Sequence, residues 1–218
     1  MATLSEENYL KAIFHLENKF EQGANTNALA EKMETKPSSV TDMLKKLSQK
    51  KLVDYKKYQG AKLSKKGKEK ALEIIRKHRL WEVFLVEKLN FSWDEVHDVA
   101  EQLEHVQSRK LTLELDRFLG HPKRDPHGDP IPDAEGNFDF NDRMLLSELE
   151  EGANGIFSGV KDSSASFLQY LDKQEITLGK EIAVLERENF DHSIRIKMDG
   201  KTKHISALAA NNIFIKTS

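Results

Sequence analysis

The prolines of this chain are concentrated in one short stretch, which separates two parts of different character. Residues 120–139 read GHPKRDPHGDPIPDAEGNFD and hold four of the five prolines together with three glycines. Proline lacks a backbone N–H donor and is disfavoured inside helices and central strands, so no regular element is expected to cross this stretch. The sequence therefore predicts a linker or extended arm between an N-terminal and a C-terminal part.

The N-terminal part begins with helical patterns followed by a β-prone pair of segments. Apolar residues recur at helical spacing up to about residue 20, in residues 26–33 (TNALAEKM) and in residues 38–52 (SSVTDMLKKLSQKKL). Pro37 stands at the start of the third pattern, where its missing N–H costs nothing, and Ser38 and Ser39 can supply capping oxygens. The segment LVDYKKYQGAKLS is typical of a hairpin. This order predicts a winged helix-turn-helix.

The rest of the chain divides at the arm. Helical patterns cover residues 64–89, 92–107 and 108–119, and the second of these opens with a capping box, Ser92 followed by Glu95. Beyond the arm, about five short β-type runs separated by turn residues predict a small antiparallel barrel. We therefore expect a mainly α protein with a small β domain. Its expected domains are residues 1–72, 73–140 (helical, with the proline-rich arm) and 141–218.

Charge is segregated along the chain although the formal net charge is only −2. Residues 1–80 hold 18 Lys and Arg against 10 Asp and Glu, whereas the remaining residues hold 16 against 26. A basic segment beside an acidic remainder favours a module that binds a polyanion. The chain has no long apolar run and begins with polar residues, so we expect a soluble, cytoplasmic protein with no membrane partner.

One helical pattern carries imidazole and carboxylate groups on a single face. His97, Glu101, Glu104 and His105 fall within an arc of roughly 100° if residues 92–107 form a helix. A second pair, His78 and Glu82, lies one turn apart on the preceding helix. With no cysteine in the chain, such a group would hold a metal through nitrogen and oxygen, which suits Mn²⁺, Fe²⁺, Co²⁺ or Zn²⁺. A solvated stripe of acids and histidines is the alternative.

Catalytic signatures are missing from the sequence. The orders H-E-x-x-H and H-x-x-E-H are absent, as are G-x-S-x-G, a Walker loop and G-x-G-x-x-G. A catalytic metal also needs an open position and a base that is not a ligand, and no residue marks one. We therefore expect no enzyme, no catalytic residues and no small organic substrate. A metal-storing or hydrolytic protein with an incidental basic half remains a distant alternative.

Six segments in order carry a resemblance to a known family: EENYLKAIFHLE, KPSSVTDMLKKL, YKKYQGAKLSKKGK, KHRLWEVFL, VHDVAEQLEHV and HGDPIP. Together they resemble the diphtheria toxin repressor and manganese transport regulator family of metal-dependent transcriptional repressors, over the whole chain. The resemblance implies a DNA-binding domain, a helical metal-binding and dimerisation domain, and a C-terminal SH3-like barrel. It also implies a homodimer that binds double-stranded operator DNA and represses metal-uptake genes.

The resemblance further implies a primary metal site whose occupation switches on DNA binding. Its ligands correspond here to Asn8, Glu101, Glu104 and His105. Glu101 matches the manganese-responsive members, whereas iron-responsive members carry cysteine there. Asn8 matches neither branch, and Lys11 replaces an acid found in some manganese-responsive members, which departs from their two-metal arrangement. Mn²⁺ is the expected cofactor and Fe²⁺, in a repressor of the same architecture, is the alternative.

An ancillary site is implied as well, so that two metal sites per subunit are expected. Its helical ligands correspond to His78, Glu82 and His97. In family members with the third domain, the barrel adds oxygen ligands. The nearest counterpart here is Asp162, with Ser163 and Ser166 as alternatives by register.

The family's DNA contacts map onto the third helix and the hairpin. The corresponding residues are Pro37, Ser38, Ser39, Thr41, Asp42, Lys45, Lys46, Lys56, Lys57 and Tyr58. The helix would enter the major groove, and its lysines and the hairpin would contact the phosphate backbone. Metal binding through Asn8 is expected to tie the first helix to the ligand-bearing helix and so to place the two recognition helices of a dimer for operator half-sites.

Overall fold

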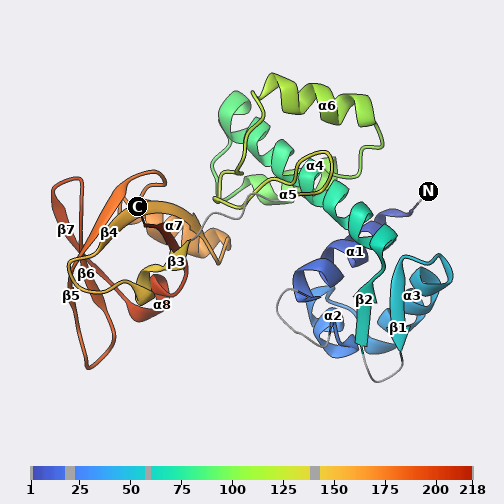
Figure 1. Ribbon diagram of the computed structural model, residues 1–218, viewed down its shortest axis with the longest axis horizontal. Helices are drawn as coiled ribbons and strands as arrows, with labels where there is room; N and C mark the ends of the chain where they lie inside the picture. Colours follow the sequence, from blue (N-terminus) through green and yellow to red (C-terminus); the bar gives the residue numbers. More distant parts are fainter. Residues whose placement is uncertain (1, 18–22, 57–59, 138–142, 218) are drawn as a thin grey trace. The chain divides into compact units, whose positions relative to one another are not determined.

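The computed structural model describes residues 2–17, 23–56, 60–137 and 143–217 (Figure 1). The chain forms two compact units, each made of segments that are distant in sequence. The first comprises Met1–His78, Glu101–Thr112 and Pro132–Asn137, and the second comprises Arg79–Ala100, Leu113–Ile131 and Phe138–Ser218. Helix α4 (Lys65–Leu89) begins in the first unit and ends in the second. Within the described part of the chain, no helix is both long and apolar enough to cross a membrane.

The first unit contains the predicted winged helix-turn-helix. Helices α1 (Leu4–Glu17), α2 (Thr26–Lys32) and α3 (Pro37–Gln49) precede an antiparallel hairpin of β1 (Val53–Lys56) and β2 (Gly60–Leu63). The apolar faces of these helices bury side chains completely: Leu10, Ile13, Leu29, Val40, Leu44 and Leu47. The predicted order of elements is confirmed, and the expected turn residues 57–59 lie outside the described residues.

Helix α3 begins at Pro37, as the sequence predicts, but its cap differs from the prediction. The residue before the helix is Lys36, in an extended conformation, and no side-chain hydrogen bond caps the helix. The predicted capping by Ser38 and Ser39 is therefore wrong. Because Pro37 is already the first helical residue, both serines lie inside the first turn, past the position from which a hydroxyl can cap the free N–H groups.

Helices α5 (Val96–Leu103) and α6 (Arg109–Phe118) follow α4. Side chains of α4 and α6 form a small core with the arm: Leu80, Val83, Leu115 and Ile131. Helix α5 is shorter than predicted at both ends. One hydrogen bond of the predicted capping box forms, from Ser92 N–H to Glu95 Oε1 at 3.0 Å. The helix itself begins after this turn, at Val96. At the other end Val106 N–H bonds to Leu103, which places Glu104 and His105 in a turn.

The C-terminal residues form the predicted small antiparallel domain, with a core built on Phe157 and aliphatic side chains. Its strands are β3 (Met144–Leu145), β4 (Asn154–Val160), β5 (Glu181–Arg187), β6 (Ile194–Met198), β7 (Lys201–Ile205) and β8 (Ile213–Lys216). They form one sheet in the order β3-β8-β4-β5-β6-β7. A 3-10 turn, η1 (Leu146–Glu148), and helices α7 (Ala165–Lys173) and α8 (Ala207–Ala210) complete the domain. The sequence did not predict the two helices, because β-type runs surround both.

The proline-rich arm contains a hydrogen-bonded turn at residues 125–129. Asp125 Oδ1 accepts hydrogen bonds from the N–H groups of His127 and Asp129, both at 2.9 Å. The carbonyl of His127 accepts from Val160 N–H at the end of β4, 2.9 Å away. Gly128 has φ +85°, and a Cβ built there would lie 2.1 Å from the Ser158 carbonyl oxygen. The arm thus packs against β4 at position 128, where only glycine fits without strain or a clash.

Replacing Gly128 by alanine tests this close approach. Gly128→Ala combines an unfavourable positive φ with a backbone clash, and we expect a loss of about 2–4 kcal/mol in unfolding free energy. Gly120→Ala is the matched control, because Gly120 has φ +75° but no atom within 4 Å of the added Cβ. Urea unfolding measures both, and the control is expected to lose about 1 kcal/mol. Equal losses would mean that the contact with β4 is unimportant.

Candidate metal centre

Helix α1 directs a cluster of polar side chains at the end of α5. Glu7, Asn8 and Lys11 lie one residue and then one turn apart, so they occupy one side of the helix. Lys11 Nζ lies 3.0 Å from Glu101 Oε1 and 2.8 and 2.9 Å from the two carboxylate oxygens of Glu104. An ammonium group therefore lies between two of the residues that the sequence predicts as metal ligands.

Glu104 is the centre of this cluster. Its side chain is fully buried, and His78 Nδ1 lies 2.6 Å from Glu104 Oε2. Burial alone would raise the pKa of Glu104, but the hydrogen bond to His78 and the charge of Lys11 outweigh burial and hold the pKa below its usual value. A carboxylate in this position is ionised and needs positive charge around it. His78, which the sequence assigned to the ancillary site, here bonds to a primary-site residue.

Glu7 belongs to the same cluster and was missed by the sequence analysis. Its carboxylate is buried, and its Oε2 lies 2.7 Å from His105 Nδ1. Gln107 Nε2 donates to Glu7 Oε1 at 2.9 Å. His105 Nε2 points the other way, 3.7 Å from Glu104 Oε1. We call Glu7, Asn8, Glu101, Glu104 and His105 the primary group, since these side chains from α1 and the end of α5 offer ligand atoms side by side.

The primary group fits a divalent cation in its chemistry. Among the described residues, Asn8 Oδ1 is a buried oxygen with no hydrogen-bond partner. Such an atom is costly to leave unpaired, and a metal ion is one partner that would satisfy it. The other donors are carboxylate oxygens and imidazole nitrogen, the set that Mn²⁺ and Fe²⁺ accept. The orphan amide oxygen supports the sequence prediction that Asn8 is a ligand.

A second cluster lies on α4 and the arm, within the second unit. Glu82, Asp125 and His127 are buried, and one ligand atom from each lies within 4.8 Å of the others. Glu82 Oε1 lies 3.6 Å from His127 Nδ1 and 3.5 Å from His97 Nδ1. His78 precedes Glu82 by one turn of α4, and the predicted ligands His78, Glu82 and His97 also offer ligand atoms within 4.8 Å of one another. We call Glu82, Asp125 and His127 the ancillary group.

Two members of the ancillary group, Asp125 and His127, were missed by the sequence analysis. The arm motif HGDPIP contains His127, but the motif was read as part of a linker and as one segment of the family resemblance, not as a source of metal ligands. The available signal was the sequence Asp-Pro-His-Gly, in which a histidine follows an aspartate by two residues and both side chains can act as metal ligands. Helical spacing cannot find such residues, because an irregular arm has no period.

Electrostatics in the ancillary group favour a cation. Burial raises the pKa of Asp125, and the nearby carboxylates of Glu82 and Asp129 raise it further. Burial would lower the pKa of His127, but its contact with Glu82 and the charge of Asp125 raise the pKa above its usual value. Negative charge is thus crowded in a buried space. His127 Nε2 also lies 2.7 Å from the Trp93 carbonyl, which orients the ring.

Asp162 lies at the surface of the C-terminal domain. Its side chain is exposed, and its Oδ1 accepts a hydrogen bond from Ser164 N–H at 2.9 Å. Ser163 and Ser166, its alternatives by register, are exposed as well. Among the described residues, none of these three joins a group of His and acidic side chains with converging ligand atoms.

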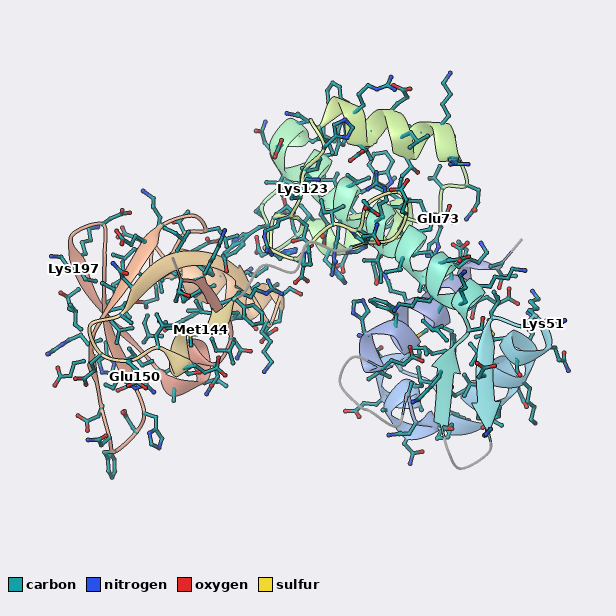
Figure 2. The ribbon with its side chains drawn as sticks, in the orientation of Figure 1. Lys51, Glu73, Lys123, Met144, Glu150 and Lys197 are labelled. Carbon is teal, nitrogen blue, oxygen red and sulfur yellow. The ribbon has the colours of Figure 1, made fainter. Side chains whose placement is uncertain are left out.

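The predicted DNA-contacting residues of α3 form its outward face. Thr41 is half-buried, and the other members are exposed: Pro37, Ser38, Ser39, Asp42, Lys45 and Lys46. Asp42 pairs with Lys45 at 3.3 Å. On β1, Lys56 is exposed, whereas the predicted contacts Lys57 and Tyr58 lie outside the described residues. Lys51, labelled in Figure 2, extends the exposed basic charge beyond the end of α3.

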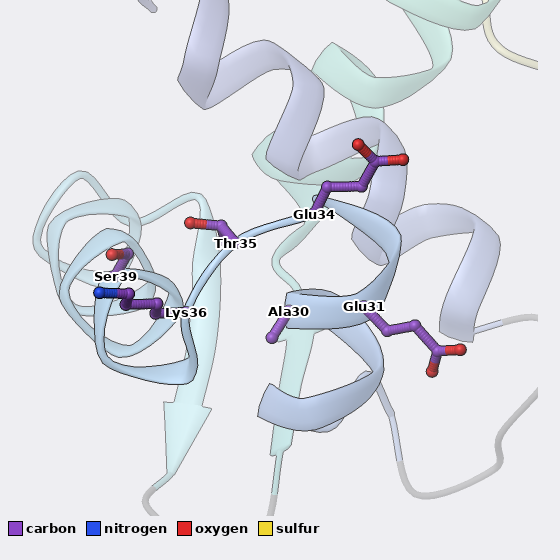
Figure 3. A pocket seen from close by; sticks show the side chains of 6 residues that line it. All are labelled: Ala30, Glu31, Glu34, Thr35, Lys36 and Ser39. Atoms are coloured by element: carbon purple, nitrogen blue, oxygen red, sulfur yellow. The ribbon is translucent and has the colours of Figure 1, made fainter.

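A shallow groove of about 560 Å³ lies between α2 and α3 (Figure 3). It is lined by Ala30, Glu31, Glu34, Thr35, Lys36 and Ser39. None of these residues belongs to either metal-ligand cluster. The groove borders the start of α3 and carries acidic side chains on its α2 side, so it does not resemble an anion-binding cleft.

Glu6 connects α1 to α3 on the opposite side of α1 from the primary group. Its fully buried carboxylate lies 2.7 Å from Lys50 Nζ and 3.0 Å from Lys46 Nζ. It also accepts from Thr3 N–H at 3.1 Å. Burial would raise the pKa of Glu6, but hydrogen bonds from Lys50, Lys46 and Thr3 lower it to about 2. The helix that contributes to the primary group is therefore tied to the helix predicted to contact DNA.

Comparison with known proteins gives matches along nearly the whole chain. Residues 1–61 match the family model of the iron dependent repressor N-terminal DNA binding domain, and residues 64–133 match that of the iron dependent repressor metal binding and dimerisation domain. Residues 144–217 match the FeoA domain. The iron-dependent repressor IdeR of Mycobacterium leprae is 29% identical over 188 residues, which are 85% of this chain and 72% of that protein.

Solved structures agree with these matches. A manganese-dependent transcriptional repressor in complex with manganese is 34% identical, with a TM-score of 0.87, and the match covers 98% of this chain and 100% of that one. The manganese regulator SloR is also 34% identical, with a TM-score of 0.76 and 98% coverage of both chains. The chain is thus similar both to manganese-dependent and to iron-dependent regulators.

The Glu6 contacts predict a specific dependence of stability on pH. Because the folded pKa of about 2 lies below the ordinary value of 4.5, the stabilisation by Glu6 is present above pH 4.5 and is lost as the pH falls toward 2. Lys46 and Lys50 are partly exposed, so we expect only about 1–2 kcal/mol. Urea unfolding of wild type and Glu6→Gln from pH 6 to pH 2.5 should show a gap that closes on acidification. A gap that does not depend on pH would contradict this assignment.

Proposed function

The chain belongs to the diphtheria toxin repressor family of metal-dependent, DNA-binding repressors, and we propose that this member is a manganese-dependent repressor of metal-uptake genes. The observation that carries the proposal is the primary group, which joins α1 to the end of α5 through nitrogen and oxygen donors alone. Thiolate and thioether ligands, which favour softer metals, are not part of it. In this proposal one ion is held by Asn8, Glu101, Glu104 and His105, with Glu7 orienting the imidazole.

The proposed mechanism uses α1 as the link between ion and DNA. An ion bound by Asn8 and by the end of α5 would favour one position of α1, and Glu6 connects that helix to Lys46 of α3 and to Lys50, the residue that follows α3. Metal therefore acts as a co-repressor by favouring one conformation, and operator DNA must in turn tighten metal binding. The partner is double-stranded operator DNA bound by a homodimer, with α3 in the major groove and the hairpin on the phosphates.

The proposal includes two ions per subunit and three domains. The second ion would be held by Glu82 together with His78 and His97, as the sequence predicts, or together with Asp125 and His127 of the arm. Asp162 or a neighbouring serine remains the proposed contribution of the C-terminal domain. The domains are proposed at residues 1–72, 73–140 and 141–218, with the arm included in the second. An iron-dependent repressor of the same architecture is the second candidate, favoured by the similarity to IdeR.

Removal of the Glu104 charge tests metal-dependent repression directly. Glu104→Gln keeps the size of the side chain but loses a charged ligand, so the increase in DNA affinity caused by Mn²⁺ should fall by about 10- to 100-fold. Glu114→Gln on α6 is the matched control, because Glu114 is half-exposed and pairs with nearby Arg117. Fluorescence anisotropy on promoter fragments of metal-uptake genes measures DNA binding.

The same assay separates the alternatives. Anaerobic titrations with buffered Mn²⁺ and Fe²⁺ decide between the two metals, and stronger activation by Fe²⁺ at equal free concentration would favour the iron-dependent repressor. DNA affinity that persists equally in excess chelator and in Glu104→Gln would contradict the co-repressor role. That result would favour a metal-storing or hydrolytic protein.

The ancillary group is tested by stoichiometry. His127→Gln removes an imidazole ligand, and we expect bound Mn²⁺ to fall from two ions to one per chain while the affinity of the remaining site is unchanged. His121→Gln is the control on the same arm, because His121 is largely exposed and pairs with Asp116. Equilibrium dialysis with elemental analysis gives the count. Two ions retained in His127→Gln would show that this imidazole is not a ligand.

A further inference from the structure

Lys11 has a position that the proposed ligand set does not require. Its Nζ contacts Glu101 Oε1 at 3.0 Å and both carboxylate oxygens of Glu104 at 2.8 and 2.9 Å. The Lys11 side chain is only 13% exposed and that of Glu104 is fully buried. An ordinary surface ion pair would leave both partners in water and contribute little. Here a lysine is drawn into a buried site by two carboxylates.

The ammonium group and a metal ion need the same oxygens. A divalent ion binds carboxylate oxygens at about 2.0–2.6 Å, close to where the ammonium hydrogens of Lys11 now meet Glu101 and Glu104. Two positive charges at such short range repel strongly when water is largely excluded. An ion bound by both glutamates therefore requires Lys11 to move away from them.

We propose that Lys11 is a tethered competitor of the metal ion at the primary group. Without metal, its ammonium neutralises Glu101 and Glu104 and holds α1 against the end of α5. When the ion binds, it replaces the ammonium, and Lys11 is released toward solvent. The cost of this exchange raises the free metal concentration at which the switch operates. Because the lysine is part of the chain, dilution does not remove it.

The tethered lysine also bears on the number of ions. Lys11 faces Glu101 and Glu104, and its protonated amine offers no ligand atom for a second ion there. The primary group then holds a single ion. This inference rests on the proposed function, since it assumes that an ion binds Glu101 and Glu104.

Metal affinity provides the first test. Lys11→Gln removes the competing charge, and Mn²⁺ affinity at the primary group should rise by about tenfold or more. Lys11→Arg keeps the charge and should retain the weaker affinity. Lys173→Gln, at an exposed position on α7, removes the same charge elsewhere and should leave the affinity unchanged. Calorimetric titration measures the Mn²⁺ affinities. The binding site that disappears in Glu104→Gln is assigned to the primary group, which separates it from the ancillary group.

Chemical labelling of the wild-type chain provides a second test that needs no variant. Lys11 should react slowly with an N-hydroxysuccinimide ester in excess chelator and several-fold faster in saturating Mn²⁺, as followed by mass spectrometry of the peptide. Ligand binding normally protects a lysine, so faster labelling is specific to displacement. Equal or slower labelling with Mn²⁺ would overturn the inference, as would unchanged affinity in Lys11→Gln. By contrast, if Mn²⁺ bound at the primary group neither in the wild type nor in Lys11→Gln, the proposed metal site itself would be overturned.

Discussion

The buried charge of Glu104 governs the arrangement of the helices around it. A carboxylate removed from water is stable only if positive charge or hydrogen-bond donors replace its hydration. Lys11 from α1 and His78 from α4 supply them, both at hydrogen-bond distance. Three segments far apart in sequence must therefore meet at one point. A change in the cation at that point changes the free energy of their arrangement, which is the physical basis for a switch.

Helix α1 links the charges around Glu104 to α3, because adjacent residues on α1 contact different neighbouring segments. Glu7 and Lys11 contact residues in or just after α5, while Glu6 contacts Lys46 of α3 and Lys50 just after it. All of these contacts involve buried acidic or basic groups, so breaking any of them leaves a charge without its partner. In the proposed mechanism, α1 would therefore move as a body and keep its contacts with Lys46 and Lys50.

Sequence reasoning predicted this architecture where periodicity carries information and failed where it does not. Helical spacing found Glu101, Glu104 and the winged helix-turn-helix, because packing faces repeat every three or four residues. It placed Glu104 on a helix, whereas the chain leaves α5 at Leu103 and the side chain is positioned by α1 and α4. Asp125 and His127 were missed because their orientation comes from the turn of the arm and its contact with β4, which no local pattern encodes.

The two metal-ligand clusters differ in how they balance the same excess of negative charge. In the ancillary group, Asp125 has the Arg79 guanidinium 3.4 Å away at its edge and the His127 imidazole among the ligand atoms. An imidazole can lose its proton and remain as a ligand, so an ion enters without displacing a side chain. In the primary group the balancing charge is an ammonium, which cannot become a ligand without deprotonation and must leave. Binding there is necessarily coupled to movement of Lys11 on α1, which makes the primary group the one suited to switching.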